Sequence, residues 1–157
     1  SLFDVTDVAN PKEISKFNIG NRGTESEALR DHKAFLFSRQ RNLLVIPVLL
    51  AEINEAKYPG GVQSNAYGDY TFEGAYVLEL SLDKGFVLKG RISHADEDAL
   101  KKSGHYYGGS PVRRSLYIGS VLYSISGRLI KMNSLDDLRE INKIQLPDVE
   151  EPQYYIG

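Results

Sequence analysis

The sequence contains no cysteine and no tryptophan, and the first of these absences already limits its chemistry. Without cysteine the chain can form no disulfide bond, and it offers no thiolate as a nucleophile or metal ligand. The absence does not decide the cellular compartment, because secreted proteins without cysteine also exist. It therefore excludes kinds of chemistry rather than a location.

Long apolar runs and a large excess of one charge are missing as well. No run approaches the roughly 20 apolar residues that a membrane-spanning helix needs, and the first seven residues, SLFDVTD, lack the basic and apolar regions of a signal peptide. The formal net charge is −2, whereas a nucleic-acid-binding protein needs a basic face to neutralise phosphates. We therefore expect no membrane span in this chain and no nucleic-acid partner.

Short stretches of alternating polar and apolar residues are present throughout, and they predict an all-β chain. The stretch HKAFLFSRQRNLLVIPVLL reads as two apolar strands, residues 32–38 and 42–50, joined by a polar turn at 39–41. Further strands are predicted at residues 1–6, 12–19, 72–82, 86–94, 114–119, 121–126, 128–132 and 138–146. Two-residue hairpin turns are predicted at residues 119–120 and 126–127.

Two local features qualify this pattern. Pro47 removes a backbone donor from a strand, which indicates either a bulge or the point at which one neighbouring strand stops pairing. Thr24 and Glu27 stand at the spacing of a capping box, so one helical turn is predicted within residues 24–30.

Three stretches of the chain resemble one another. They begin at Ser1, Tyr76 and Leu129, and each consists of a strand, a polar turn containing Asp and an alternating strand. We interpret the chain as a half blade at 1–19, a blade at 32–94 with a long insertion at 51–70, a compact blade at 113–146 and a tail at 147–157. Four-stranded antiparallel units that repeat in this way are typical of a β-propeller. A β-sandwich with chance alternation is the alternative.

About two and a half blades cannot close a ring, because closed propellers have about four to eight. We therefore expect a fragment of a larger propeller, or an assembly of several chains. The strands at His32 and Leu138 would leave unpaired surfaces that favour association with the remaining blades or with another copy.

The pieces also resemble a known family, the secreted archaeal and bacterial proteins with a C-terminal β-propeller domain distantly related to WD repeats. The resemblance rests on LFDVTDVANPKEI at 2–14, SEALRDHKAFLF at 26–37, NLLVIPV at 42–48, GAYVLELSLDKGFVLKGRISH at 74–94 and RRSLYIGSVLYSIS at 113–126. The Trp-Asp dipeptide itself is absent, because the chain has no Trp. The resemblance implies a propeller fold and an extracellular or cell-surface location, and it implies no established catalytic activity.

Connections between antiparallel strands alternate between the two ends of a sheet, so the long loops 20–31, 51–70 and 95–112 are expected on one face. Long loops gathered on a rigid scaffold are where binding sites usually lie, although such loops can also be tolerated insertions. The candidate ligand-binding residues on this face are Glu27, Asp31, His32, Tyr67, Tyr70, His94, Tyr106, Tyr107 and Arg113.

Each candidate has a purely structural interpretation beside the functional one. The tyrosines suit peptide or sugar recognition, or they hold the loops against the sheet. Asp31 and His32 stand where the chain enters an inner strand and form either an acid–base pair or a set of ordinary loop hydrogen bonds. Arg113 would clamp an anion or lie in solvent at the start of a strand.

Three functional hypotheses follow. The first is a binding or scaffold module that presents its loops to a protein, a peptide or a glycan. The second is a metal-dependent, hydrolase-like site that uses Glu27, Asp31 and His32 with residues of further blades, and the third is a structural cell-surface element. The sequence contains no zinc or EF-hand spacing, no nucleophile elbow and no phosphate-binding loop. No catalytic residue, metal site or cofactor is therefore assigned.

Overall fold

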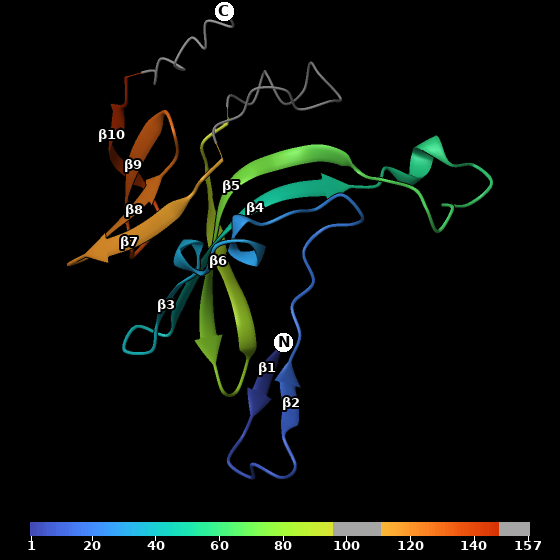
Figure 1. The fold of residues 1–157 in the computed structure, drawn as a ribbon, viewed down its shortest axis with the longest axis horizontal. Helices are drawn as coiled ribbons and strands as arrows, with labels where there is room; N and C mark the ends of the chain where they lie inside the picture. The colour runs from blue at the N-terminus through green and yellow to red at the C-terminus, as the bar shows by residue number, and fades with distance from the viewer. Residues whose placement is uncertain (96–110, 148–157) are drawn as a thin grey trace, which may run out of the picture.

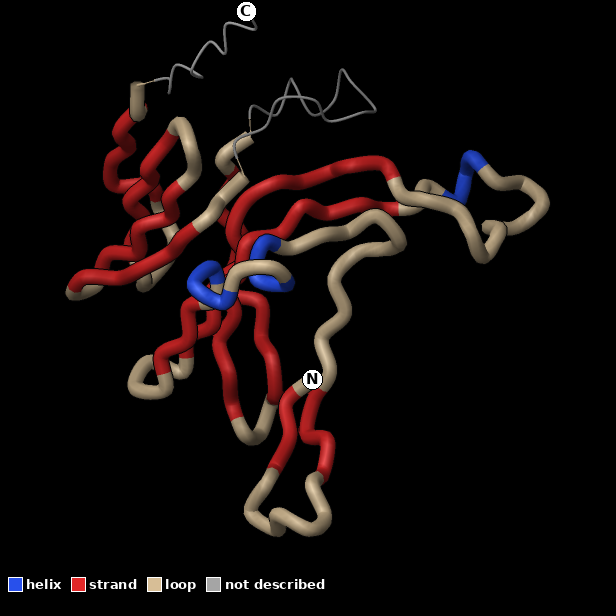
Figure 2. The backbone as a smooth tube through the Cα atoms, in the orientation of Figure 1, coloured by secondary structure: helices blue, strands red, loops and turns tan. Residues whose placement is uncertain are grey.

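The computed structural model describes residues 1–95 and 111–147, and strands are the dominant secondary structure of this part of the chain (Figure 1). The described residues contain no α-helix and only three short 3₁₀ turns, all of them in connections (Figure 2). The strands are β1 (Leu2–Asp4), β2 (Lys12–Ser15), β3 (Leu36–Ser38), β4 (Leu43–Glu52), β5 (Asp69–Ser81), β6 (Gly85–Ser93), β7 (Arg114–Ile118), β8 (Val121–Ile125), β9 (Leu129–Ser134) and β10 (Glu140–Gln145).

The described strands form three sheets, and within each sheet every strand pairs antiparallel with its neighbour in the sequence. The hairpin β1–β2 stands alone, β3-β4-β5-β6 form the middle sheet, and β7-β8-β9-β10 form the C-terminal sheet. The three sheets follow one another in space without closing a ring (Figure 1). The prediction of an all-β chain with four-stranded antiparallel blades, as in a partial propeller, is confirmed.

The centre of the middle sheet, in β4 and β5, is buried on both faces, which explains the continuous apolar run in β4. Leu43, Val45 and Val77 pack on one face in a cluster that extends into the C-terminal sheet. On the other face, Val48 and Tyr76 form a second cluster against residues that follow the N-terminal hairpin. Burying a side chain of this size contributes roughly 1.5–3 kcal/mol, so the stacking of sheets stabilises the fold.

Pro47 marks the place where one neighbouring strand stops pairing, which was one of the two predicted alternatives. Strand β3 pairs with β4 only at Leu43–Val45, whereas β5 pairs with β4 along its whole length. Beyond the end of β3, the loop that precedes β3 forms hydrogen bonds with the free edge of β4. Ser26 Oγ donates to the Pro47 carbonyl at 2.5 Å, and Glu25 forms an isolated bridge with Leu49.

The strand predicted at residues 32–38 is shorter than expected. His32–Ala34 form the 3₁₀ turn η2, and β3 begins only at Leu36. The cause is Asp31, whose side chain accepts a hydrogen bond from the Lys33 amide and caps the turn. A side-chain cap thus outcompetes the strand pattern over three residues.

The helical turn predicted within residues 24–30 exists, but its cap is a different residue. Glu27–Leu29 form the 3₁₀ turn η1, and Ser26 accepts from the Ala28 amide. Thr24 Oγ1 instead bonds to both the amide and the carbonyl of Ala51. The capping-box interpretation of Thr24 was therefore wrong, because Thr24 is used to hold its loop against β4.

Other boundaries differ from the prediction as well, and β2, predicted over 12–19, ends at Ser15. The loop placed at 51–70 is shorter at both ends, because β4 continues to Glu52 and β5 starts at Asp69. Leu138, predicted to begin the last strand, lies in the turn before β10 with a φ of 61°. Its side chain packs on the shared core, and a Cβ at Gly90 of β6 would lie 2.7 Å from its Cδ1 atom. Leu138 is thus a contact between sheets rather than a strand residue.

Candidate functional site

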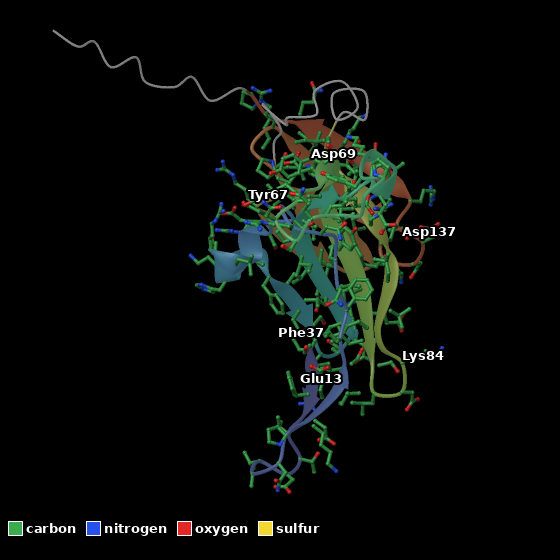
Figure 3. The ribbon with its side chains drawn as sticks, turned by 90° about the vertical axis from the view of Figure 1, so that its right-hand side faces the viewer. Glu13, Phe37, Tyr67, Asp69, Lys84 and Asp137 are labelled. Atoms are coloured by element: carbon green, nitrogen blue, oxygen red, sulfur yellow. The ribbon has the colours of Figure 1, made fainter. Side chains whose placement is uncertain are left out.

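The connections of the middle sheet are long at one end and tight at the other. The loop at 53–68, with the 3₁₀ turn η3 (Glu55–Lys57), extends from one end of β4 and β5. The turns β3–β4 and β5–β6 and the β1–β2 connection lie at the opposite end (Figure 1). Figure 3 shows the same division, with Tyr67 and Asp69 at one end and Glu13 and Lys84 at the other. We call the end that carries the loop at 53–68 the loop-rich end.

The segment that leads into β3 is held firmly along the loop-rich end of β4. The Asn21 amide donates to the Ala51 carbonyl at 2.8 Å, and the Ile53 amide donates to the Asn21 side chain at 2.9 Å. Glu25 and Leu49 exchange two backbone hydrogen bonds of 2.9 Å each. Because this loop is fixed by backbone and side-chain bonds, its exposed groups are pre-positioned for a ligand.

A pocket of about 290 Å³ opens at this end, between the fixed loop, the middle sheet and the residues that precede β7. Its apolar wall includes Val48, Gly74 and Val112, and its polar wall includes Glu25, Glu27, Arg30 and Glu73. Glu73 is only 2% exposed. The pocket is large enough for a side chain or a short peptide segment, although it lies near the lower limit of ligand sites.

The carboxylates of Glu25 and Glu27 in the pocket wall differ in their ion pairing. The Arg30 guanidinium lies 2.7 Å from the Glu25 carboxylate. The Glu27 carboxylate has no hydrogen-bond or ion-pair partner within residues 1–95 and 111–147, although its backbone carbonyl accepts from Arg30 and Asp31. Among the described residues, the Glu27 carboxylate therefore remains available to a cationic ligand.

Both carboxylate oxygens of Asp31 form bonds within the protein. Its Oδ1 atom caps η2, and its Oδ2 atom lies 2.7 Å from Arg114 Nη2 at the start of β7. The hydrogen bond from the Lys33 amide, followed by that from Arg114, lowers the pKa of Asp31 below its usual value. His32 is exposed on η2 beside it. The Asp31 carboxylate joins the middle sheet to the C-terminal sheet.

His94 lies between the two four-stranded sheets. Its Nε2 atom is 2.7 Å from Ser124 Oγ of β8, and its Nδ1 atom is buried with no partner in the described part of the chain. Burial, and then the charge of Lys131, lower the pKa of His94 to about 4, whereas Glu140 acts in the opposite direction. The ring is therefore neutral at pH 7.

A serine and a histidine at this distance resemble a nucleophile and its base. Ser124, however, is 0% exposed, so no substrate reaches its hydroxyl. The pair therefore serves to join the sheets. Sequence reasoning missed Ser124, and its only signal was that Ser124 and Ser126 alternate with apolar residues where a strand was expected to be buried.

The remaining candidates do not converge on one point in the described residues. Tyr67 is 63% exposed, with the Arg22 guanidinium 4.5 Å from its ring centre. Tyr70 is half-buried in β5, where it pairs with Ala51. Arg113 is exposed, and its amide donates to the Ile125 carbonyl. Tyr106 and Tyr107 lie outside the described residues.

Neither a metal site nor a membrane-spanning helix is found in what the structure describes. Over residues 1–95 and 111–147, His, Asp and Glu side chains nowhere gather in a group of three or more that could hold a metal ion. Over the same residues, no helix has the length and hydropathy needed to cross a bilayer.

Comparison with known protein families gives a match over most of the chain. The family model described as the beta propeller domain matches residues 1–138, which is most of the 157-residue chain. No curated protein matches, and no solved structure matches. The stacked four-stranded sheets and this match agree, and the chain belongs to the beta propeller domain family.

Proposed function

We propose that this chain is a binding module of a propeller, and that its loop-rich end receives a peptide segment carrying a basic side chain. The observation that supports this most is the pocket beside η1, where Glu27 carries a carboxylate without a partner in the described residues. The apolar wall suits the aliphatic stem of a Lys or Arg side chain, and the carboxylate suits its charged end.

The second argument for a binding site is that the loop beside the pocket is held rigidly. The loop that carries Glu25, Ser26 and Glu27 is bonded to the edge of β4 rather than free in solvent. A ligand would therefore lose little affinity to ordering this part of the protein. The same end carries the exposed ring of Tyr67, which offers a flat surface for a longer peptide or for a glycan.

The metal-dependent alternative has little support among these residues. Both carboxylate oxygens of Asp31 are used, one by the Lys33 amide and one by Arg114. A catalytic role for Asp31 with His32 would require breaking the contact between sheets.

The test uses fluorescently labelled hexapeptides that differ only in a central Lys, Arg, Leu or Glu, with anisotropy as the measurement. We expect binding of the Lys and Arg peptides, and we expect Glu27→Gln to weaken it by about fivefold, because one partly exposed charge pair contributes roughly 1 kcal/mol. Glu13→Gln makes the same chemical change at the opposite end of the molecule (Figure 3) and should leave affinity unchanged. Equal affinity for the Glu peptide, or an equal loss with Glu13→Gln, would refute the proposal.

For the location of the protein, we propose the cell surface or the extracellular space, a proposal that rests on the family resemblance of the sequence. Protease treatment of intact source cells provides the test. Loss of the protein from intact cells, or its recovery in the medium, is the expected result. Full protection until the cells are lysed would contradict the proposal.

A further inference from the structure

Strand β6 is the outermost strand of the middle sheet, and its outer edge has no partner strand among the described residues. The sheet has the order β3-β4-β5-β6, so β6 pairs with β5 on one side only. Near the start of the strand, the side chain of Ser15 accepts a hydrogen bond from the Phe86 amide. Within residues 1–95 and 111–147, no strand other than β5 pairs with residues 87–93. The unpaired backbone groups of such an edge are a template for a further strand.

The register of the β5–β6 pair shows which backbone groups of β6 face this edge. The His94 amide donates to the Glu73 carbonyl, so the amide of His94 points inward, toward β5. Hydrogen-bonded and non-hydrogen-bonded pairs alternate along an antiparallel ladder. Ser93 and Arg91 therefore form non-hydrogen-bonded pairs with β5. The amide and carbonyl groups of Arg91 and Ser93 point away from β5, to the free edge.

The same pairing holds the Arg91 side chain in place. Arg91 stands opposite Tyr76, and side chains are close together in a non-hydrogen-bonded pair. The guanidinium carbon of Arg91 is 5.0 Å from the ring centre of Phe72 and 5.8 Å from that of Tyr76. The two rings meet edge to face, and Tyr76 is only 6% exposed, so the surface under the guanidinium belongs to the core. A guanidinium stacked in this way keeps its in-plane N–H donors for an anion.

The charge of the strand indicates which kind of partner the edge would attract. Strand β6 contains two cations, Lys89 and Arg91, and no acidic residue. Both side chains are exposed, and neither has an ion-pair partner in the described part of the chain. The outer strand of the C-terminal sheet, β10, differs, because it carries Glu140 at 2.9 Å from Lys131. An acidic strand would be attracted to β6, whereas β6 of a second copy would place like charges opposite each other.

We propose that the outer edge of β6 binds an extended acidic peptide segment, which adds as a fifth, antiparallel strand with a Glu or Asp side chain against Arg91. Main-chain hydrogen bonds with Arg91 and Ser93 attach the segment, and the contact between carboxylate and guanidinium selects it. This surface is separate from the pocket beside η1. The pocket is lined by Glu73, whereas the neighbouring Phe72 side chain points to the opposite face of β5.

The test uses a fluorescently labelled octapeptide in which Glu and Thr alternate, with anisotropy as the measurement on the full chain. Alternation places every carboxylate on one face of the added strand. We expect this peptide to bind, and we expect its counterpart with Gln in place of Glu to bind about fivefold more weakly, as for a partly exposed charge pair. Amide hydrogen exchange at Arg91 and Ser93 should slow in the complex, because both amides gain an acceptor.

Two N-methylated peptides test the strand addition itself. In an antiparallel pair, the residue opposite Arg91 shares its face and directs its own amide at β6, so this residue is a Glu. N-methylation of the Glu residues removes those donors and should weaken binding by about tenfold. N-methylation of the Thr residues changes amides that point away from β6, and it should leave most of the affinity.

Two glutamine substitutions test the role of Arg91. Arg91→Gln should weaken binding of the Glu peptide by about fivefold. Arg22→Gln makes the same change at another exposed arginine, which lies over the ring of Tyr67 and outside β6, and it should leave affinity unchanged. Because both arginines are exposed, the melting temperature of each variant should stay within about 2 °C of the parent chain. Arg91→Lys keeps the charge without the planar donors and should restore only part of the affinity.

Three results would overturn the proposal. One is equal affinity for the Glu and Gln peptides, which would mean that charge does not select the ligand. Another is equal affinity for the two N-methylated peptides, because the peptide would then not pair with β6. The third is a loss with Arg22→Gln as large as that with Arg91→Gln, since the attraction would then be one of overall charge.

Discussion

His94 joins the two four-stranded sheets through its Nε2 atom, which lies 2.7 Å from Ser124 Oγ. Burial lowers its pKa from 6.5 to about 4 in the folded protein. Between these two values the unfolded chain binds more protons at this residue than the folded chain does. The stability provided by neutral His94 is therefore complete above about pH 6.5 and is lost progressively as the pH falls towards 4.

We therefore predict that the melting temperature falls between pH 6.5 and pH 4, and that His94→Gln reduces this fall. Glutamine can keep a hydrogen bond to Ser124 but does not titrate. The measurement is a pair of thermal unfolding series across this range, in which His32→Gln serves as the control because His32 is exposed. An unchanged pH dependence in His94→Gln, or an equal change in His32→Gln, would contradict the role given to His94.

Single residues are also where the sequence was least informative. The bond between His94 and Ser124 joins positions 30 residues apart, and the pair between Asp31 and Arg114 joins positions 83 apart. No local pattern contains such partners. Sequence reasoning therefore selected Asp31 and His94 as ligand-binding candidates, and the structure gives each of them a partner in the neighbouring sheet.

At the scale of one element, β5 and β6 approach each other so closely that only glycine fits at one position. A Cβ at Gly74 would overlap the Ile92 carbonyl, which is backbone and cannot rotate away. Gly60, in the loop at 53–68, has nothing within 4 Å of such an atom. The same substitution at these two positions thus compares a tight strand pair with an open loop.

We predict that Gly74→Ala lowers the free energy of unfolding by about 1–3 kcal/mol, the usual cost of overpacking. Gly60→Ala should change it by less than about 0.5 kcal/mol. Urea titration of both variants provides the measurement. A Gly74→Ala variant as stable as the Gly60→Ala variant would mean that β5 and β6 are not paired in the register described.

The elements themselves were largely predictable, because alternation and turn residues specify strands locally. All ten described strands overlap predicted ones. The boundaries failed where a side chain competes with the strand pattern, as Asp31 does when it caps η2. They also failed at Leu138, whose positive φ no local rule assigns to a leucine.

At the scale of the whole molecule, the sheets stack so that the centre of the middle one is buried on both faces. The repeat in the sequence predicted this stacking, since a four-stranded unit cannot bury both of its faces alone. The gathering of long connections at one end also followed from antiparallel order. What could not be predicted is the pocket beside η1, because it depends on how residues 25–30 attach to β4 and on Val112, which precedes β7.

The central claim is that the loop-rich end is the binding end, and amide chemical-shift mapping tests it most directly. The labelled full chain would be titrated with the hexapeptide that carries a central Lys. The account predicts shifts concentrated at residues 25–30, 48–49 and 73–74, which surround the pocket. Shifts concentrated at the β1–β2 connection and the β5–β6 turn, or no shifts at saturating peptide, would contradict it.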